Sequence, residues 1–415
     1  MKRKTFLFLY NNLNLGGIQK SMVNIIRQIK KDGNRIIWIT TNQNQVDEGF
    51  LKDIEGIEIY QYNSKKYNSL DSLKIFFEKN EEVVGLAFAY REYCFLLRIK
   101  EKNKNMIFTT ILWMPHFEGK SLFYEEYFPQ PLKLFMKIHM KKQYKKLDKN
   151  DNIFYINTSH AKGLSSHYKF LISNLEKKIY TKPILNCKKE FNSEKIKERF
   201  KSRKFNILTL SRFSFPHKGY IIGLVKDFNE LQKKYPNLTL TIAGYGEDEK
   251  ILNDEIQKLD KTVQDKIFLI GKVEYDKLDL IFKEANLFIG VAGAVSDASR
   301  TGLISIPVRH NTYTCEGYGY SFKKIDMLTS RAKGKNIKFF IKQVLEMTEK
   351  EYLECSKKTF NTFNPKDFVK IGEHTLKLEN TTNKIVISLY LEKLIERLYC
   401  FVSKFINIKK LIMKK

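Results

Sequence analysis

The chain has 415 residues, more than one ordinary hydrophobic core accommodates, which predicts two domains. Hydrophobic residues make up 43% of it, so an intrinsically disordered chain is excluded. The formal net charge of +28 comes mainly from lysine. Such a charge attracts phosphates and anionic membrane surfaces. The alternative is that the lysine excess reflects only the base composition of the gene. Because the chain is poor in arginine and lacks nucleic-acid-binding motifs, we expect no nucleic-acid partner.

The cysteines and apolar runs indicate a cytoplasmic protein. The cysteines are scattered without a CxxC pair, which argues against both a disulfide framework and a structural zinc site. The apolar run after the basic start MKRK is too short for a signal peptide and reads as a first buried strand. No apolar run reaches the roughly 18 residues that a membrane span needs.

Short apolar runs alternate with helical patterns in the first half of the chain. Expected strands are TFLFLY (5–10), RIIWIT (35–40), GIEIYQY (56–62), VVGLAF (83–88), MIFTTILW (106–113) and NIFYIN (152–157), and expected helices cover 17–33 and 69–80. This alternation is typical of a parallel sheet covered by helices.

A second series of the same kind begins near residue 204. Its expected strands are 204–211, 238–244, 266–271, 286–291 and 303–308, and its expected helices are 219–236, 248–260, 275–285 and 296–302. A charged, weakly patterned linker (182–204) separates the two series. We therefore predict two Rossmann-like, doubly wound parallel-sheet domains of the α/β class that face a cleft, over residues 1–190 and 204–370.

Two segments combine apolar residues with lysine. Residues 371–415 form a third, basic amphipathic segment, which either packs across the domains as a terminal helix or touches a membrane surface. Residues 131–151 interleave apolar side chains with lysines. They fit either a solvated helix with one face in the first domain or a helix that docks on anionic lipid.

Loops after the expected strands carry the candidate binding residues. Gly16 and Gly17 precede a helix and allow a ligand to approach its N-terminus, although a plain turn is the alternative. Arg212 and Lys218 flank a proline-containing loop, and two converging cations suit a diphosphate, unless they are ordinary surface charges. His116 ends an apolar strand, where it contacts a reacting group or is merely packed or solvated.

Glycines and acids follow another strand of the second series. Gly244 and Gly246 permit a tight turn and a close approach of ligand. Glu247, Asp248 and Glu249 open the next helix, where acids complement the helix dipole.

The order of these motifs resembles the GT-B glycosyltransferases, specifically the large retaining family 4 that uses nucleotide sugars. The resemblance rests on LGGIQKS, LSRFSFPHKG, IAGYGEDEK, IFLIGKV and SDASRTGLISIPV, in this order, and covers most of residues 5–320. It implies that Gly16 and Gly17 face the donor phosphates and that His116 lies near the transferred sugar. Arg212 and Lys218 would hold the diphosphate and help expel the nucleoside diphosphate.

The resemblance also assigns residues to the nucleoside. Backbone at Lys272 and Val273 would contact the base, and Asp297 would bind the ribose hydroxyls. Gly293 and Ser296 would let the phosphates approach the N-terminus of the next helix. The chain departs from the family in this loop, where Asp297 stands for a second glutamate and Pro307 is displaced, and the main departure concerns the first glutamate. The family's first glutamate, eight residues before the position of Asp297, is Ile289 here. This loss puts recognition of the donor sugar in question.

The predicted function is transfer of a sugar from a nucleoside diphosphate to a hydroxyl of a glycan or lipid-linked acceptor, in capsular, lipopolysaccharide or other cell-surface polysaccharide synthesis. We expect a metal-independent, hexosyl-type enzyme without cofactor, cytoplasmic and peripheral at the inner face of the membrane. Two alternatives stay open: a catalytically silent GT-B protein that binds a glycan or partner enzyme, and a nucleotide-sugar epimerase.

Overall fold

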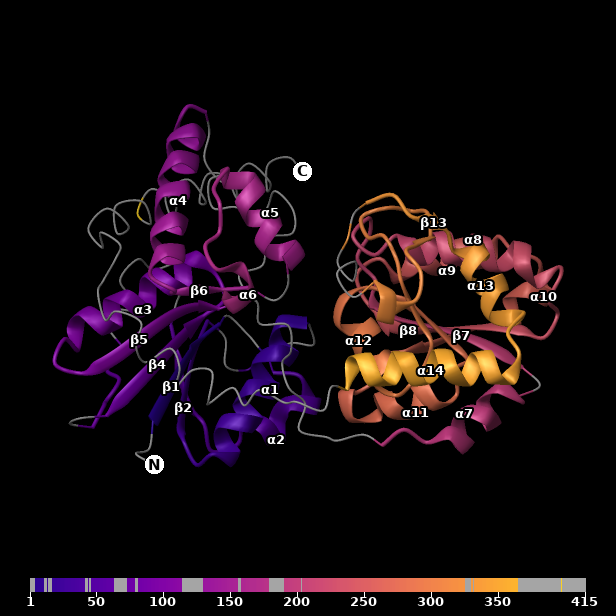
Figure 1. Cartoon of the computed structure of the whole chain (residues 1–415), viewed down its shortest axis with the longest axis horizontal. Helices are drawn as coiled ribbons and strands as arrows, with labels where there is room; N and C mark the ends of the chain where they lie inside the picture. The colour runs from indigo at the N-terminus through magenta and orange to yellow at the C-terminus, as the bar shows by residue number, and fades with distance from the viewer. Residues whose placement is uncertain are drawn as a thin grey trace. The chain divides into compact units, whose positions relative to one another are not determined.

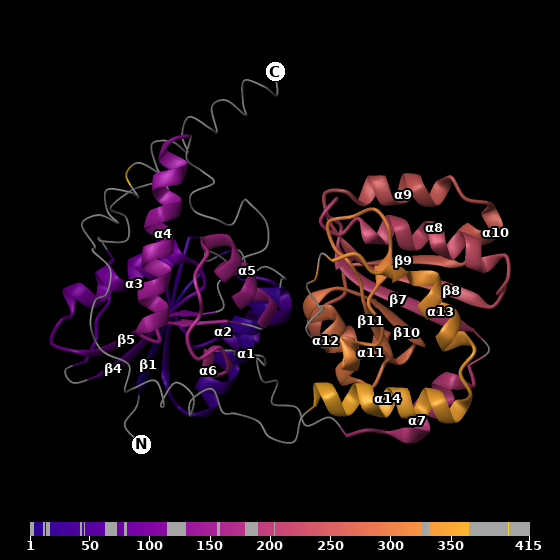
Figure 2. The same ribbon diagram turned by 45° about the horizontal axis from the view of Figure 1, so that its top comes forward.

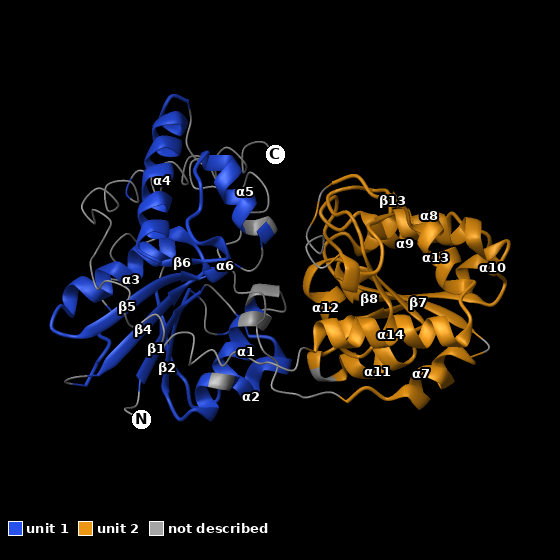
Figure 3. Ribbon diagram, in the orientation of Figure 1, with its two compact units in different colours: residues 1–186, 369–415 blue, residues 187–368 orange. Residues whose placement is uncertain are grey.

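The chain forms two compact units, each built around its own parallel sheet (Figures 1 and 3). Unit 1 comprises residues 1–186 with 369–415, and unit 2 comprises residues 187–368. The computed structural model describes residues 4–10, 13, 17–41, 44, 46–62, 73–78, 81–113, 130–155, 158–178, 190–202, 204–324, 330, 332–364 and 397. Apart from Arg397, the predicted C-terminal segment 371–415 lies outside the described residues.

The sheet of unit 1 has six parallel strands in the order β3-β2-β1-β4-β5-β6. The strands are β1 (Lys4–Leu9), β2 (Arg35–Thr40), β3 (Glu58–Gln61), β4 (Glu82–Ala87), β5 (Ile107–Trp113) and β6 (Ile153–Phe154). The helices are α1 (Gly17–Lys31), α2 (Leu51–Ile54), α3 (Tyr90–Lys102), α4 (Leu132–Lys149), α5 (Thr158–Tyr168) and α6 (Leu175–Lys178). Continuous apolar runs form the central strands because residues on both faces of the sheet are buried.

Unit 2 repeats this design with five parallel strands in the order β11-β10-β7-β8-β9. The strands are β7 (Phe205–Arg212), β8 (Leu238–Tyr245), β9 (Ile267–Gly271), β10 (Leu287–Gly290) and β11 (Ser305–Pro307), and a small ribbon pairs β12 (Glu316–Gly317) with β13 (Lys335–Asn336). The helices are α7 (Ser193–Phe200), α8 (Tyr220–Gln232), α9 (Glu249–Gln257), α10 (Lys261–Gln264), α11 (Leu278–Lys283), α12 (Ala292–Arg300), α13 (Ile337–Leu345) and α14 (Glu349–Phe363). In Figures 1 and 2, α8, α9 and α13 cover one face of the sheet, while α7, α11 and α14 cover the other.

Both sheets therefore have the doubly wound topology expected from the alternating pattern. In each unit the strand order reverses once, between β1 and β4 in unit 1 and between β7 and β10 in unit 2. These reversals are the switch points at which such sheets bind ligands, outside the carboxyl ends of the strands. The predicted fold class of two Rossmann-like parallel-sheet domains is confirmed.

The expected helix over 69–80 is wrong where the structure describes it. Residues 73–78 form no helix, and their side chains alternate between half-buried and exposed. Leu73, Ile75 and Phe77 pack against the core of unit 1, while Phe76 is 73% exposed. A period of two is that of an extended chain, so packing against the core overrides the helical pattern.

The expected linker over 182–204 is also partly wrong, because α7 occupies residues 193–200. The side chain of Asn192 caps this helix by accepting the N–H of Lys195 at 3.0 Å. Ile196 is buried in the core of unit 2, which explains why a mostly charged segment folds here.

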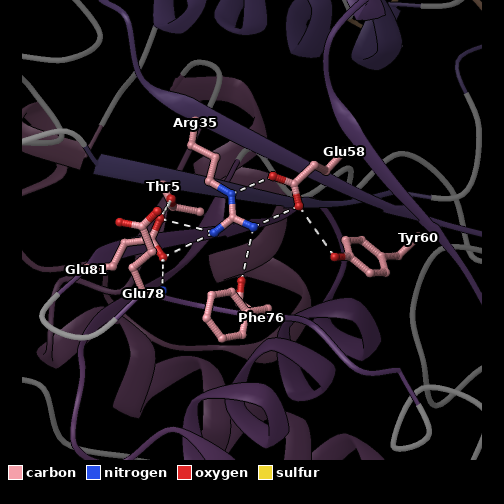
Figure 4. A network of polar contacts seen from close by, with 7 residues as sticks. All are labelled: Thr5, Arg35, Glu58, Tyr60, Phe76, Glu78 and Glu81. Carbon is pink, nitrogen blue, oxygen red and sulfur yellow. Dashed lines mark hydrogen bonds and ion pairs between the residues drawn. The ribbon is translucent and has the colours of Figure 1, made fainter.

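Ion pairs around Arg35 join the amino ends of the strands of unit 1 (Figure 4). The Arg35 guanidinium binds both oxygens of Glu58, at 2.6 and 2.8 Å, and both oxygens of Glu81, at 3.2 Å. It also donates to the carbonyl of Phe76 at 3.0 Å, and Thr5 donates to Glu81. These carboxylates raise the pKa of Arg35 above its ordinary value. The network lies at the amino ends of the strands, whereas ligands bind at the carboxyl ends. We therefore assign it a structural role.

Candidate nucleotide site in unit 2

The candidate site lies at the carboxyl edge of the unit 2 sheet, around its switch point. β7 ends at Arg212 and β10 ends at Gly290. The loop 213–219 and the start of α12 follow these two strands directly. The site residues predicted from sequence in this unit are Arg212, Lys218, Gly244, Gly246, Lys272, Val273, Gly293, Ser296 and Asp297. All of them follow or end the strands β7 to β10 at this edge.

The loop 213–219 is a compact turn that leads from β7 into α8. The N–H of Lys218 donates to the carbonyl of Ser214 at 2.8 Å, and the N–H of Gly219 donates to that of Pro216 at 3.0 Å. The Arg212 side chain at one end of the loop is exposed, and Lys218 near the other end is half-buried. Two cationic side chains thus lie at the two ends of one short loop that follows a central strand. This arrangement suits a diphosphate.

Asp248 holds this loop in place, a role that the sequence did not indicate. Its carboxylate accepts the N–H of Phe215 at 2.5 Å, and its own N–H donates to the carbonyl of Phe213 at 3.3 Å. Asp248 was expected to serve the N-terminus of its own helix, but it makes no side-chain cap bond there. The acid therefore fixes the loop after β7 rather than capping its own helix.

Gly244 and Gly246 are required by the same loop. A Cβ at Gly244 would lie 1.8 Å from the carbonyl oxygen of Ser211, and one at Gly246 would lie 2.1 Å from that of Phe213. Gly244 also has a φ of +148°, which side chains rarely adopt. The GxG pattern was expected to let a ligand approach closely. In the structure, the close neighbour of each glycine is instead a backbone carbonyl of the chain itself.

Lys272 extends across the end of β8. Its ammonium lies 5.9 Å from the ring centroid of Tyr245 and 3.2 Å from a carboxylate oxygen of Glu274. Tyr245 pairs with Arg212 in the strand register, so these three side chains share one part of the sheet edge. The neighbouring Val273 packs into the apolar cluster beneath. Tyr245 is a further candidate contact, and its only sequence signal is its position between the two glycines.

The helix expected over residues 296–302 begins earlier, because residues 292–295 are already helical. β10 ends at Gly290, and α12 already begins at Ala292. Ala292 has a φ of 54°, an unfavourable angle that turns the chain sharply from strand to helix. Val291, the N-cap residue, provides no side-chain hydrogen bond to the first turn. The start of α12 therefore presents backbone N–H groups that no capping side chain covers, a favourable place for an anion.

One face of α12 carries the predicted site residues of this segment, together with Arg300. Ser296 and Asp297 each lie three or four residues from Gly293 and from Arg300, and all four residues are exposed or half-buried, whereas Val295 packs into the core. A Cβ at Gly293 would meet no atom within 4 Å, so packing does not require glycine there. Asp297 lies about 6 Å along the helix axis from Gly293. A ribose could span this distance from a phosphate bound at the start of the helix.

The switch point of unit 1 is described only in part. α1 begins at Gly17 after β1, as expected, whereas Gly16 and His116 lie outside the described residues. At the carboxyl end of β4, α3 brings Glu92 into its first turn. Burial raises the pKa of the Glu92 carboxyl, and sequence reasoning missed this residue because α3 was not predicted. Within the described ranges, no group of three His, Cys, Asp or Glu residues could hold a metal ion.

Comparison with solved structures places this fold among the GT-B glycosyltransferases. One similar structure is the Anabaena protein Alr3699/HepE in complex with UDP-glucose, at a TM-score of 0.58 and 13% identity, covering 91% of this chain and 98% of that one. A second is S. aureus TarM in complex with UDP and other ligands, at a TM-score of 0.56 and 12% identity, covering 91% and 100%. A third is a glycosyltransferase from Rickettsia africae, at a TM-score of 0.55 and 14% identity, covering 92% and 100%.

Sequence comparison supports this class for part of the chain. Residues 190–291 match the family "Glycosyl transferases group 1". This range runs from α7 to the end of β10 and includes Arg212, Lys218, Lys272 and their loops. A search of curated sequences found no match. The resemblance to GT-B glycosyltransferases is therefore confirmed, while the roles of individual site residues stay predictions.

Proposed function

We propose that the chain transfers a sugar from a nucleoside diphosphate donor to a hydroxyl group of an acceptor. The observation that carries the proposal is that two elements suited to an anion follow the neighbouring strands β7 and β10 at the switch point of unit 2. One is the loop 213–219, which Arg212 precedes and which contains Lys218, and the other is the start of α12, which has no side-chain cap. A sugar nucleotide needs such a place for its diphosphate.

Arg212 and Lys218 would bind the diphosphate and offset the negative charge that develops on it as the bond to the sugar breaks. Each hydrogen bond to a charged group contributes about 1.5–3 kcal/mol, and cations positioned before the reaction lower the barrier to departure of a phosphate group. Asp248 supports both side chains indirectly, because it holds the loop between them.

The nucleoside would lie along α12 and the end of β9. Gly293 leaves room for phosphate at the helix start, Ser296 borders it, and Asp297 accepts hydrogen bonds from the ribose hydroxyls. Backbone at Lys272 and Val273 would contact the base. The solved relatives that bind UDP or UDP-glucose favour uracil as the first base to test.

Other parts of the proposal rest on the sequence resemblance. Gly16 and Gly17 would face the donor phosphates, and His116 would lie near the transferred sugar. We further propose retention of anomeric configuration, a metal-independent reaction and a role in cell-surface polysaccharide synthesis, with a glycan or lipid-linked acceptor. Product anomers can be assigned by proton NMR, and activity that survives EDTA would support independence from metal.

A catalytically silent sugar-nucleotide or glycan binder is the second candidate, and one residue favours it. Ile289, which replaces the family's first glutamate, is fully buried in β10 and cannot contact a donor sugar. Binding without turnover is the expected behaviour of such a protein.

Binding of nucleotides tests the site directly. The purified chain is titrated with nucleoside diphosphates and their sugars, and binding is followed by thermal shift and calorimetry. A ligand at 100 times its dissociation constant stabilises the native state by about 2.7 kcal/mol. The variants are Lys218→Gln and Asp297→Asn, and their matched controls are the exposed Lys226→Gln and Asp254→Asn in the same unit.

We expect one nucleotide to bind the wild type and both controls, and to bind both site variants at least tenfold more weakly. Equal binding by site and control variants would reject the assigned site. Binding without transfer to any acceptor would support the silent protein. Conversion of the free sugar nucleotide without acceptor would indicate an epimerase.

A further inference from the structure

The helix α4 has one face that belongs to the core of unit 1. Met136, His139, Gln143 and other residues on this face are buried, and Met140, Tyr144 and Leu147 lie within the hydrophobic cluster. The last turn is anchored as well, because the buried Asp148 binds the ammonium of Lys178 at 2.8 Å. These contacts fix how α4 presents its opposite face.

The opposite face is apolar in its first half. Leu134 is 60% exposed, Phe135 is 54% exposed and Ile138 is 62% exposed. Ile138 lies four residues after Leu134 and three after Phe135, so the three side chains form one patch on the helix surface. Single exposed apolar residues need no explanation, but a cluster at one place indicates an interaction.

The same face is basic in its second half. Lys142, Lys145 and Lys149 are exposed, and Lys141 is half-exposed beside them. The sole acid of α4 is Asp148, which is buried and paired. The exposed face therefore carries positive charge without any compensating carboxylate of its own helix.

The apolar half is the end of α4 that projects from the sheet. Residues 150–152 connect the last turn of α4 to β6, so the first turns lie at the far end. Figures 1 and 2 both show this end extending away from the strands of unit 1. None of the helices in the described part of the chain is both long and apolar enough to cross a bilayer.

We infer that α4 docks on a membrane surface that carries anionic lipids. Leu134, Phe135 and Ile138 enter the boundary between headgroups and acyl chains, and the lysines contact the headgroup phosphates. A membrane surface engages both the apolar and the basic half of this face, whereas nucleic acid would engage the lysines but not the apolar residues. The inference rests on the proposed function and extends it, because docking would bring the enzyme to a lipid-linked acceptor held at the membrane surface.

The experiment measures sedimentation of the full-length chain with vesicles and needs neither donor nor acceptor. One set of vesicles contains phosphatidylcholine alone, and the other contains phosphatidylcholine with phosphatidylglycerol. The apolar variant changes Leu134, Phe135 and Ile138 to serine. The basic variant changes Lys142, Lys145 and Lys149 to glutamine. Circular dichroism verifies that each variant keeps its helices.

Control variants carry changes of the same kind in unit 2, at two apolar residues and at three lysines. Ile251→Ser with Leu280→Ser removes exposed apolar side chains, and Lys226→Gln, Lys250→Gln and Lys277→Gln together remove the same charge. If only total charge mattered, the two lysine triple variants would bind alike.

We expect the wild type and controls to bind anionic vesicles and to be released by salt. Each lysine contributes about fivefold to partitioning, so the basic variant should bind about a hundredfold more weakly. The apolar variant should bind at least tenfold more weakly to the same vesicles. The inference would be overturned if both α4 variants bound as well as the wild type. It would also be overturned if the wild type bound both kinds of vesicle equally, or bound neither. A wild-type protein that binds vesicles but no nucleotide would contradict only the proposed function, because α4 belongs to unit 1 and the candidate nucleotide site to unit 2.

Discussion

The carboxylate of Asp248 accepts the backbone N–H of Phe215 at 2.5 Å and so joins two elements 33 positions apart in the chain. The bond connects the start of α9 to the loop that carries Lys218. A hydrogen bond to a charged acceptor that lies half-buried is stronger than an ordinary one. The shape of the candidate phosphate loop therefore depends on a residue that would not itself touch a nucleotide.

Replacement of Asp248 by alanine should weaken both the fold and the site. We expect the free energy of unfolding to fall by about 2 kcal/mol and nucleotide affinity to fall with it, because the loop loses its restraint. Asp248→Asn keeps an acceptor oxygen and should restore most of both. Urea unfolding and calorimetric titration measure the two effects, with the exposed neighbour variant Glu247→Gln as control. Unchanged affinity in Asp248→Ala would show that the loop holds its shape without this bond.

Two glycines should respond in opposite ways to alanine. Gly244→Ala places a Cβ 1.8 Å from the oxygen of Ser211, at a φ of +148°, so we expect a loss of about 3 kcal/mol in the free energy of unfolding. Gly293→Ala meets open space within α12 and should gain up to about 1 kcal/mol.

Chemical denaturation distinguishes the two glycine variants. If Gly293 also admits a phosphate, the more stable Gly293→Ala protein should nevertheless bind nucleotide more weakly. Tight binding by that variant would remove Gly293 from the site while leaving the stability prediction intact.

Glu92 should make the protein less stable as pH rises. Burial raises the pKa of its carboxyl in the folded state, so the folded protein retains a proton that the unfolded chain releases near pH 4.3. The penalty is absent below that pH and grows until the pH passes the folded-state pKa. We therefore expect Glu92→Gln to be more stable than wild type at pH 7 and equally stable near pH 4.

The pH effect is measured by thermal unfolding across this range. Glu101→Gln on the same helix removes a carboxylate that is less buried and should leave the profile unchanged. A Glu92→Gln protein that is less stable at pH 7 would mean that the ionised carboxylate has a favourable partner.

Loss of Arg35 should reduce stability without affecting nucleotide binding. Arg35→Met leaves Glu81, whose side chain is 10% exposed, without its cation, and we expect a loss of about 3 kcal/mol. Adding Glu81→Gln should recover part of that loss, since the buried charge is then removed. Urea unfolding measures this, with the exposed Lys102→Met as control. A matching fall in nucleotide affinity would contradict the structural role of this edge.

The site was predictable only where residue type alone carries the information. Arg212 and Lys218 stand out because cations in a loop after a strand suit phosphate. Asp248 and Tyr245 did not, because their roles depend on the register between β7 and β8. The pattern GxG indicates close approach but does not say whether a ligand or the chain's own backbone is the neighbour.

The sequence by itself determined the doubly wound fold. Apolar runs long enough for buried strands, alternating with amphipathic helices, have few other ways to bury their apolar surface. Only the tertiary structure decided the conformation of residues 73–78, where contacts with the core of unit 1 impose an extended chain. It likewise decided that α12 begins directly after β10 and that Leu134, Phe135 and Ile138 remain exposed. Local pattern is set by neighbours in the chain, whereas burial is set by neighbours in space.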